Sequence, residues 1–408
     1  MQIDYHALAS RYGTPLYVYD FDAMSEQYRA LKEAFAGRKS LIAYAVKANA
    51  NLSVISHFSA QGSGADCVSI GEVRRALAAG IAPYKIIFSG VGKQDGEIET
   101  ALRKGILLIN LESEAEMQRV EAIAQRLNTV ARISVRVNPN VDPKTHPYIS
   151  TGLHENKFGV AMDTAKRMYL HAQRSDYLDP VGIHFHIGSQ MTDLAPIRAA
   201  IEIVADLVRS LHAIDVAIKF FDVGGGLGVV YRDEIPIDLT AYAQAITQAI
   251  RGMDVTIICE PGRYLTANSG VLLTRVLYEK QHGDKRFVIV DAAMNDLMRP
   301  TLYQAYHRID YLGHSTEAST PADVVGPICE SGDWLGEDVM LPPMHHDDLM
   351  AIRSAGAYGF TMASNYNTRG RAAEVAVEHG ESRLIRDREN FEDQIRLEKA
   401  YLDQQTKG

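Results

Sequence analysis

The stretch Leu41-Ile-Ala-Tyr-Ala-Val-Lys-Ala-Asn-Ala50 decides the fold. It is an apolar run that ends on a lysine, and it is the first of a series of short apolar runs along the chain. Residues 41–46 have the character of a buried strand, which places Lys47 at the carboxyl end of that strand. A lysine there suits an ion pair with a buried carboxylate, or a Schiff base in which a desolvated amine attacks a carbonyl group. This stretch alone favours the ion pair, as the simpler use.

Seven more short apolar or β-branched runs follow, and most are separated by segments of helical periodicity. The strand-like runs are residues 65–68, 85–88, 106–109, 131–137, 181–186, 219–223 and 255–259; the helical segments include 70–79, 97–103, 114–127 and 197–213. Parallel neighbours need crossover connections, so the alternation predicts a parallel sheet. Eight such units in about 230 residues predict a closed (β/α)8 barrel rather than an open, doubly wound sheet.

Polar residues stand where these runs end, at the face on which barrel enzymes place their sites. They are Lys47, Ser69, Ser89, Asn110, Asn138, His186, Gly224 and Glu260, each expected at or just beyond a carboxyl strand end. The polarity of loops explains the serines and asparagines well. It explains the lysine, the histidine and the glutamate less well.

The domain organisation follows from a change of rhythm after residue 270. Runs at 271–278, 286–290, 322–325 and 349–353, with turn residues between them, predict a second and mainly β domain. The strand expected at residues 16–19 is assigned to the same domain. The predicted division is therefore a barrel of residues 22–270 and a second domain of residues 1–21 plus 271–408. Residues 138–160 contain Pro139, Pro143 and Pro147, which indicates a long loop over the site.

Composition narrows the class of function. The 408 residues are 46% hydrophobic and 23% charged, with a formal net charge of -9, which fits a globular protein and argues against nucleic acid as a partner. The cysteines, Cys67, Cys259 and Cys329, are odd in number and widely spaced, as expected of reduced thiols. We see no secretory signal and no apolar run long enough for a membrane span. A cytoplasmic enzyme acting on a small molecule is expected.

Two motifs of the predicted barrel leave alternatives open. In His184-Phe-His-Ile-Gly-Ser-Gln190 the two histidines would face one side of a strand. They could be zinc ligands together with Glu260 or Cys259, although the spacing supports this weakly and no structural metal is expected. One imidazole could instead lie flat against a planar cofactor, or both could be buried and hydrogen-bonded. The run Phe220-Phe-Asp-Val-Gly-Gly-Gly-Leu-Gly-Val229 suits either a phosphate-binding turn or an ordinary tight turn.

Further candidate groups lie in four short segments. Cys259-Glu-Pro-Gly-Arg263 offers an acid for a pyridinium proton and an arginine for a carboxylate, or simply an internal ion pair. Cys329-Glu-Ser-Gly-Asp333 offers an acid/base thiol or a small packed one. Tyr358, within Gly356-Ala-Tyr-Gly359, and the Arg299–Tyr303 segment offer anion contacts or ordinary turns.

These motifs occur together and in order, and in this the chain resembles the alanine-racemase-fold pyridoxal-phosphate decarboxylases. The resemblance runs from Tyr17 to about Asn367 and rests on Tyr44-Ala-Val-Lys-Ala-Asn49 and the motifs at residues 184–190, 224–228, 260–263, 329–333 and 356–359. Within that family the chain is most similar to the branch that decarboxylates meso-2,6-diaminopimelate to L-lysine.

The resemblance implies pyridoxal 5'-phosphate as cofactor and a homodimer with shared active sites. It implies that Lys47 carries the cofactor, that His186 stacks on its ring and that Glu260 meets the ring nitrogen. The implied phosphate cradle comprises Ser189, Gly224, Gly225, Gly226, Glu260, Pro261, Gly262, Arg263 and Tyr358. Cys329, from the partner subunit, resembles the proton donor.

The implied substrate contacts are Arg263, Arg299, Tyr303, Glu330 and Tyr358, and the segment Asn156-Lys-Phe-Gly159 resembles one that helps set substrate length. Sister decarboxylases of ornithine, lysine, arginine or carboxynorspermidine are the first alternative. A racemase of this fold and a non-catalytic cofactor-binding protein are the others. Two departures, Tyr264 in place of a small residue and Gly370 in place of a proline, affect pocket detail.

Overall fold

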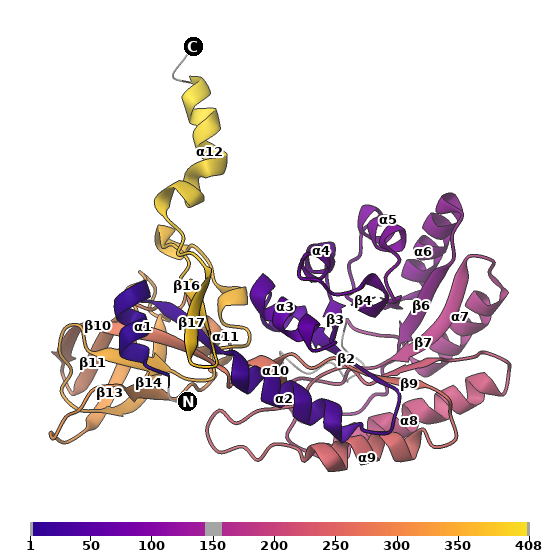
Figure 1. Cartoon of the computed structure of the whole chain (residues 1–408), viewed down its shortest axis with the longest axis horizontal. Helices are drawn as coiled ribbons and strands as arrows, with labels where there is room; N and C mark the ends of the chain where they lie inside the picture. Colours follow the sequence, from indigo (N-terminus) through magenta and orange to yellow (C-terminus); the bar gives the residue numbers. More distant parts are fainter. Residues whose placement is uncertain (1–2, 143–156, 406–408) are drawn as a thin grey trace. The chain divides into compact units, whose positions relative to one another are not determined.

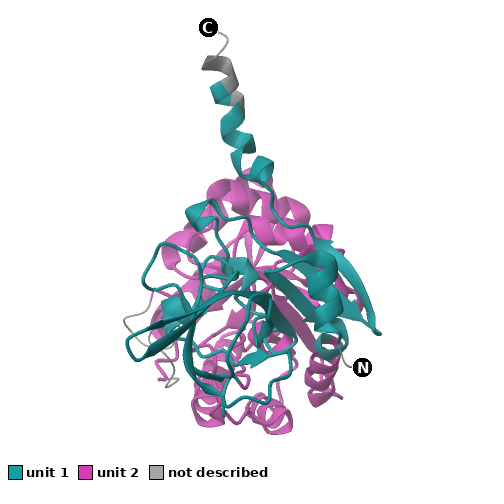
Figure 2. Cartoon of the chain, turned by 90° about the vertical axis from the view of Figure 1, so that its left-hand side faces the viewer, with its two compact units in different colours: residues 1–24, 231–233, 266–408 teal, residues 25–230, 234–265 magenta. Residues whose placement is uncertain are grey.

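We describe the protein from a computed structural model, which describes residues 3–142 and 157–405. The chain forms two compact units (Figure 2): residues 1–24, 231–233 and 266–408, and residues 25–230 and 234–265. We call them the sheet unit and the barrel unit. The division expected from the sequence, residues 22–270 against residues 1–21 plus 271–408, stays a prediction.

Eight parallel strands close the barrel, which confirms the predicted (β/α)8 architecture (Figure 1). They are β2 (Ser40–Ala45), β3 (Gly64–Cys67), β4 (Ile86–Phe88), β5 (Leu108–Leu111), β6 (Ala131–Arg136), β7 (Leu178–His184), β8 (Phe220–Asp222) and β9 (Thr256–Cys259). The ring closes where β9 pairs with β2, with Ser40 opposite Ile257. Apolar side chains from several strands, including Ala43, Ile87 and Ile258, form one buried cluster.

Helices alternate with these strands. They are α2 (Phe21–Ala34), α3 (Leu52–Ala60), α4 (Ile70–Ala78), α5 (Asp95–Lys104), α6 (Glu114–Leu127), α7 (Met162–Arg174), α8 (Leu194–His212), α9 (Leu239–Ala249) and α10 (Arg263–Thr266), with short 3-10 turns η1 (Val46–Ala48) and η2 (Pro83–Lys85). Ser69 caps α4, since its hydroxyl accepts the N–H of Glu72 at 3.2 Å. The polar residue after β3 therefore serves the next helix.

Several strand ends differ from the sequence prediction. Lys47 lies in η1, just after β2, as expected, whereas β7 ends at His184 and leaves His186 beyond the strand. Asn110 was expected at or beyond a strand end, and this was wrong: it lies inside β5. Its buried side chain donates to Ser89 Oγ at 3.0 Å, so a polar residue interrupts the apolar pattern without ending the strand.

The described residues of the sheet unit form nine strands in one mixed sheet. They are β1 (Leu16–Asp20), β10 (Gly270–His282), β11 (Lys285–Val290), β12 (Ile309–Tyr311), β13 (Thr320–Val325), β14 (Trp334–Leu341), β15 (Leu349–Ile352), β16 (Ala373–Glu378) and β17 (Glu381–Arg386). The order is β14-β13-β11-β10-β1-β16-β17, and β15 pairs with β10 and β12. The predicted mainly β second domain is confirmed, and β1 lies in its sheet, antiparallel to β10 and parallel to β16.

Helices α1 (Tyr5–Tyr12), α11 (Arg299–Tyr303) and α12 (Phe391–Gln405) and the 3-10 turns η4 (Phe360–Met362) and η5 (Tyr366–Thr368) complete the sheet unit. Its core packs Leu8 of α1 against β-strand residues such as Val18, Leu273 and Val375. Helix α12, β14, β16 and β17 were not anticipated from the sequence.

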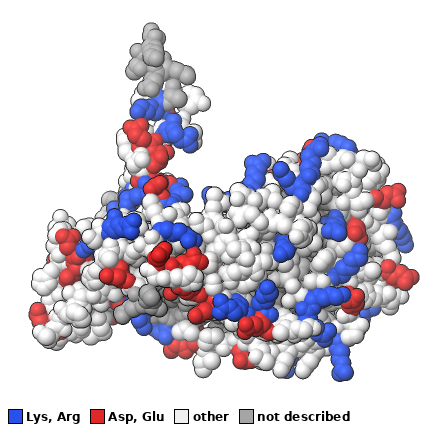
Figure 3. Space-filling model, in the orientation of Figure 1, with Lys and Arg blue, Asp and Glu red and all other residues white. Residues whose placement is uncertain are grey.

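The surface carries charges of both signs. On the face drawn in Figure 3, basic and acidic side chains are interspersed. Arg103 and Arg126, for example, each pair with Glu99 at 2.8 Å. Across residues 3–142 and 157–405, no helix has the length and apolar character needed to cross a membrane.

Candidate active site

An amine and a buried acid meet at the carboxyl end of the barrel strands. Lys47 Nζ lies 3.3 Å from Asp66 Oδ2, where β3 runs beside β2. The Lys47 side chain is 41% exposed and that of Asp66 is 1% exposed. Burial, with the charge of Glu260, raises the pKa of Asp66, although Lys47 opposes the shift. The ion pair considered for Lys47 therefore exists, and it holds an accessible amine at the barrel mouth.

The glycine run after β8 forms a tight turn that joins three neighbouring strand ends. Gly224 and Gly226 have φ values of 67° and 101°, a region that glycine adopts without strain. Gly224 N–H donates to Asp222 Oδ1 at 2.9 Å, and the N–H of Glu260 donates to Gly224 O at 2.7 Å. A Cβ atom on Gly225 would lie 2.3 Å from the Glu260 carbonyl oxygen. The tight-turn interpretation holds, and it fixes the residue that carries the Glu260 side chain.

The same turn sets the tautomer of His186. Gly225 N–H donates to His186 Nδ1 at 3.2 Å, so this nitrogen carries a lone pair and no hydrogen. Burial, together with the charges of Arg136 and Lys47, lowers the pKa of His186 well below its ordinary value. The ring is therefore a neutral imidazole, suited to lie against a planar group.

Arg263 and the residues before it are also fixed. The guanidinium donates to Ser189 Oγ at 3.0 Å, and Arg263 is 5% exposed. Pro261 O accepts the N–H of Ala45 at 3.1 Å, and a Cβ atom on Gly262 would lie 2.9 Å from that of Ala48. The segment after β9 thus packs directly on the segment that carries Lys47.

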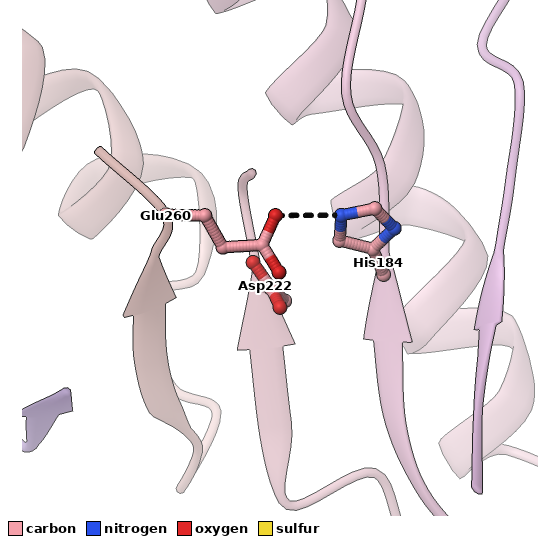
Figure 4. A group of neighbouring side chains, drawn as sticks. All are labelled: His184, Asp222 and Glu260. Carbon is pink, nitrogen blue, oxygen red and sulfur yellow. Dashed lines mark hydrogen bonds and ion pairs between the residues drawn. The ribbon is translucent and has the colours of Figure 1, made fainter. Parts of the chain in front are cut away.

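Three buried side chains gather at the ends of β7, β8 and β9 (Figure 4): His184, Asp222 and Glu260. One side-chain nitrogen or oxygen atom from each residue lies within 4.8 Å of those from the other two, and His184 Nε2 donates to Glu260 Oε2 at 3.1 Å. Burial would raise the pKa of Glu260, but the charge and hydrogen bond of His184, with help from Lys47 and Asp222, lower it to about 2. Burial and the neighbouring Glu260 raise the pKa of Asp222 well above its usual range.

This set of groups fits pyridoxal phosphate. The cofactor carries an aldehyde, a phosphate and a basic ring nitrogen. The barrel mouth offers the Lys47 amine, the Arg263 guanidinium beside Ser189, and a buried Glu260 whose Oε1 accepts no hydrogen bond from any described residue. Each of these three features therefore has a chemically matched residue at the mouth.

In the sheet unit, Arg299 is buried and held by aromatic neighbours. Its guanidinium lies 5.2 Å from the centroid of Tyr231 and 5.8 Å from that of Tyr303. Its Nε donates to His307 Nε2 at 3.3 Å, and His307 Nδ1 in turn donates to Arg353 O at 2.9 Å. Arg299 and Tyr303 thus lie together in one cluster with Tyr231 and His307, and their role as substrate contacts stays a prediction.

Cys329 and Glu330 lie on an exposed turn of the same unit. Buried Asp333 shapes this turn, because its carboxylate accepts the N–H groups of Met294 and Ile328, each at 2.7 Å. Cys329 is an exposed free thiol, and Glu330 accepts a hydrogen bond from Tyr366 at 3.3 Å. Tyr358 lies in a separate turn with a φ of 56°. The structure thus divides the predicted residues between the two units.

A model of the pyridoxal-dependent decarboxylases, covering their pyridoxal binding domain, matches residues 21–267. The diaminopimelate decarboxylase of Campylobacter jejuni is 58% identical over 401 residues, which cover 98% of this chain and 100% of that protein. The chain belongs to the diaminopimelate decarboxylase family.

A solved structure agrees with this assignment. The Helicobacter pylori diaminopimelate decarboxylase complexed with L-lysine has 54% sequence identity and a TM-score of 0.95, covering 97% of this chain and 100% of that one. The diaminopimelate decarboxylase of Neisseria meningitidis serogroup A is 52% identical over 98% of each chain. The resemblance stated from the motifs is therefore confirmed, and the chain is a pyridoxal-phosphate-dependent decarboxylase.

The structure draws attention to two acids that the sequence did not single out. Asp66 lies inside β3 and Asp222 is the last residue of β8, and both are buried against other candidate site residues. The signal available in the sequence was an acid within an apolar run. Burying such an acid costs free energy unless it has a partner. That signal does not name the partner.

The end of the long connection is tied to the barrel by another pair that sequence reasoning missed. Glu112 Oε1 lies 3.0 Å from Arg136 Nη1, and Glu112 Oε2 accepts the N–H of Gly159 at 2.6 Å. The Arg136 guanidinium also lies 4.6 Å from the Phe158 ring centroid. Asn156, Pro143 and Pro147 lie outside the described residues.

Proposed function

We propose that the protein decarboxylates meso-2,6-diaminopimelate to L-lysine and carbon dioxide, with pyridoxal 5'-phosphate as cofactor. The observation that carries this proposal is the near-complete match to diaminopimelate decarboxylases, joined to a barrel mouth whose donors suit the cofactor. The site assignments that follow are part of the proposal.

Four elements of the barrel mouth hold the cofactor. Lys47 supplies the amine that joins the aldehyde, and Asp66 keeps this amine in place. Arg263 with Ser189, and the backbone of the glycine turn, receive the phosphate. His186 lies against the ring as a neutral imidazole.

When bound, pyridoxal phosphate accepts the electron pair left on the α-carbon as carbon dioxide departs. Glu260, held as an anion by His184, accepts the hydrogen bond of the protonated ring nitrogen. Cys329 then delivers a proton to the α-carbon. Its thiol is exposed, as this role in the site of a partner chain requires.

The distal end of meso-diaminopimelate carries an ammonium and a carboxylate, so the site needs both charges. Arg299 binds a carboxylate, with its guanidinium oriented by His307 and the two tyrosine rings. Glu330 binds the ammonium. Arg263, Tyr303 and Tyr358 complete the proposed substrate contacts.

The active unit in this proposal is a homodimer in which the partner supplies Cys329 and Glu330. Both residues are exposed on a turn of well-fixed shape, as expected of groups that serve another subunit. Helix α12 also leaves large apolar side chains in solvent, with Leu397 at 72% and Tyr401 at 69% exposure. A cytoplasmic location is proposed as well, and the three free thiols support it.

The deciding experiment measures carbon dioxide release from meso-diaminopimelate, ornithine and lysine by the purified enzyme. Because the diamino monoacids lack the distal carboxylate that Arg299 is proposed to bind, we expect kcat/KM for meso-diaminopimelate to exceed theirs by at least ~100-fold. Preference for ornithine or lysine would assign the chain to a sister decarboxylase. Lys47→Ala is the matched inactive control, expected to lose both turnover and the visible absorption of the bound cofactor.

A further inference from the structure

The two carboxyl groups of the His184, Asp222 and Glu260 cluster cannot both be charged at low cost. His184 lies opposite Asp222 across the β7 and β8 pair, and Asp222 lies opposite Ile258, close to Glu260, across β8 and β9. The three residues are 2%, 1% and 6% exposed. Two neighbouring buried carboxylates repel each other and lack solvation, so one of them keeps its proton.

The hydrogen bonds of the cluster leave a place for that proton. Glu260 Oε2 accepts from His184 Nε2, and Asp222 Oδ1 accepts from Gly224 N–H. The remaining oxygens, Asp222 Oδ2 and Glu260 Oε1, are buried and have no donor among the described residues. A proton on Asp222 supplies a donor within the cluster and turns the close approach into a hydrogen bond.

The surroundings favour Asp222 as the proton carrier. Glu260 has the His184 donor and the positive charge of Lys47 nearby. Asp222 has one backbone N–H and the negative charges of Glu260 and Asp66. The pKa shifts agree with this, because burial and Glu260 raise the pKa of Asp222 whereas Glu260 stays ionised.

We infer that Asp222 is a positioning residue that stays protonated and donates a hydrogen bond to Glu260, so that Glu260 is fixed from two sides as an anion. His184 is the second donor of this arrangement. The inference rests on the proposed role of Glu260 at the cofactor ring. It predicts that Asp222 serves as a neutral donor, so an amide can replace it and an alkyl group cannot.

Other titratable groups surround the cluster and belong in any account of its pH dependence. Lys47 and Asp66 face it from the β2 and β3 ends, and His186 follows β7. Cys259 of β9 and Tyr242 of α9 lie near Asp222, and burial raises the pKa of both. Neither of these two adds a negative charge near neutral pH, so the acids of the described residues that act on Asp222 are Glu260 and Asp66.

The first experiment needs no activity. Infrared difference spectra between wild type and Asp222→Asn, both cofactor-free and with isotopically labelled aspartate carboxyl groups, are expected to show a protonated-acid carbonyl band of Asp222. The band of Asp296, whose pKa burial raises to about 7, is common to both proteins and cancels. The band of Asp222 is expected to be absent from Asp222→Asn, to be present in Asp254→Asn, whose residue is an exposed acid paired with Lys39, and to persist as pH is raised through neutrality. The inference is overturned if wild type lacks this band, or if Asp222→Asn retains it.

The second experiment uses the loaded enzyme. Asp222→Ala is expected to lower kcat by ~30-fold or more with KM little changed, and to alter the pH dependence of the cofactor absorption, because Glu260 loses a donor. Asp222→Asn is expected to restore kcat to within about fivefold of wild type, since the amide also donates. Equal damage from both variants, or a stoichiometric Zn²⁺ bound by the cofactor-free wild type, would mean that Asp222 acts as an anion and would refute the proposal.

The infrared result separates this inference from the proposed function. A band that behaves as expected in an enzyme without decarboxylase activity upholds the protonated Asp222 and refutes the function. An active decarboxylase without the band upholds the function and refutes the protonated Asp222.

Discussion

Lys47 Nζ lies 3.3 Å from Asp66 Oδ2, so the one amine that sequence analysis placed at the barrel mouth is held by an almost fully buried carboxylate. The pairing joins residues at the ends of adjacent strands, β2 and β3. It reconciles the two uses considered for Lys47, because an ion pair that positions the amine also prepares it to meet an aldehyde.

Replacing Asp66 is expected to weaken cofactor loading. Asp66→Asn removes a charge-assisted hydrogen bond worth about 1.5–3 kcal/mol, so we expect the cofactor-free enzyme to bind pyridoxal phosphate at least ~10-fold more weakly. Titration followed by cofactor absorbance measures this. Asp254→Asn breaks an exposed lysine–aspartate pair with Lys39 and is the matched control. Equal affinities for wild type and Asp66→Asn would show that Asp66 has no part in loading.

The buried pair of Glu112 and Arg136 is expected to matter for stability. Arg136→Met leaves the carboxylate buried without its cation, at an expected cost of about 3–5 kcal/mol in the free energy of unfolding. The double variant Glu112→Leu with Arg136→Met is expected to recover a large part of this loss. Thermal unfolding measures both.

The matched control for this pair is exposed Arg167, which lies 3.3 Å from Glu114. Arg167→Met is expected to cost less than about 1 kcal/mol, because solvent screens the exposed pair. A similar loss from Arg136→Met and Arg167→Met would contradict the distinction between buried and exposed pairs.

Asp296 in the sheet unit is expected to make stability depend on pH. Burial raises its pKa to about 7, against the attraction of Arg369. The folded state therefore keeps a proton that the unfolded chain releases near pH 4, and stability falls as pH rises from about 4 to about 7.

Asp296→Asn removes this titration. Its stability relative to wild type is expected to increase over the same window, by up to about 4 kcal/mol, and to level off above it. Unfolding temperatures of the two proteins at several pH values measure the difference. A difference that stays constant with pH would contradict a raised pKa for Asp296.

Subunit mixing tests the shared site. Lys47→Ala and Cys329→Ala are each expected to be inactive, and in a random mixture half of the dimers contain one of each. Every such dimer has one intact site if Lys47 and Cys329 come from different chains, so activity is expected to recover to about a quarter of wild type. No recovery, with mixed dimers shown by native mass spectrometry, would place both residues of a site in one chain.

Much of the fold could be predicted because it follows from local pattern. The eight short apolar runs and the helical periodicity between them predict a parallel barrel without any knowledge of contacts, since parallel strands need crossovers. Helix α6, Glu114–Leu127, has the predicted bounds because an apolar stripe lies between Ser113 at one end and Asn128 at the other. β14, β16 and β17 were missed although β14 pairs with β13 and β17 with β16, their neighbours in the chain; only β16 also pairs with a distant strand, β1.

The sequence by itself indicated most of the residues near strand ends, with Asn110 as an exception, and so it drew attention to Lys47, His186, Glu260 and the glycine turn. Only the tertiary structure decided what they meet. Pairing of β2 with β3 brings Asp66 to Lys47, and pairing of β8 with both β7 and β9 brings Asp222 beside His184 and Glu260. An acid in an apolar strand needs a partner, but its identity depends on strand neighbours that are distant in sequence.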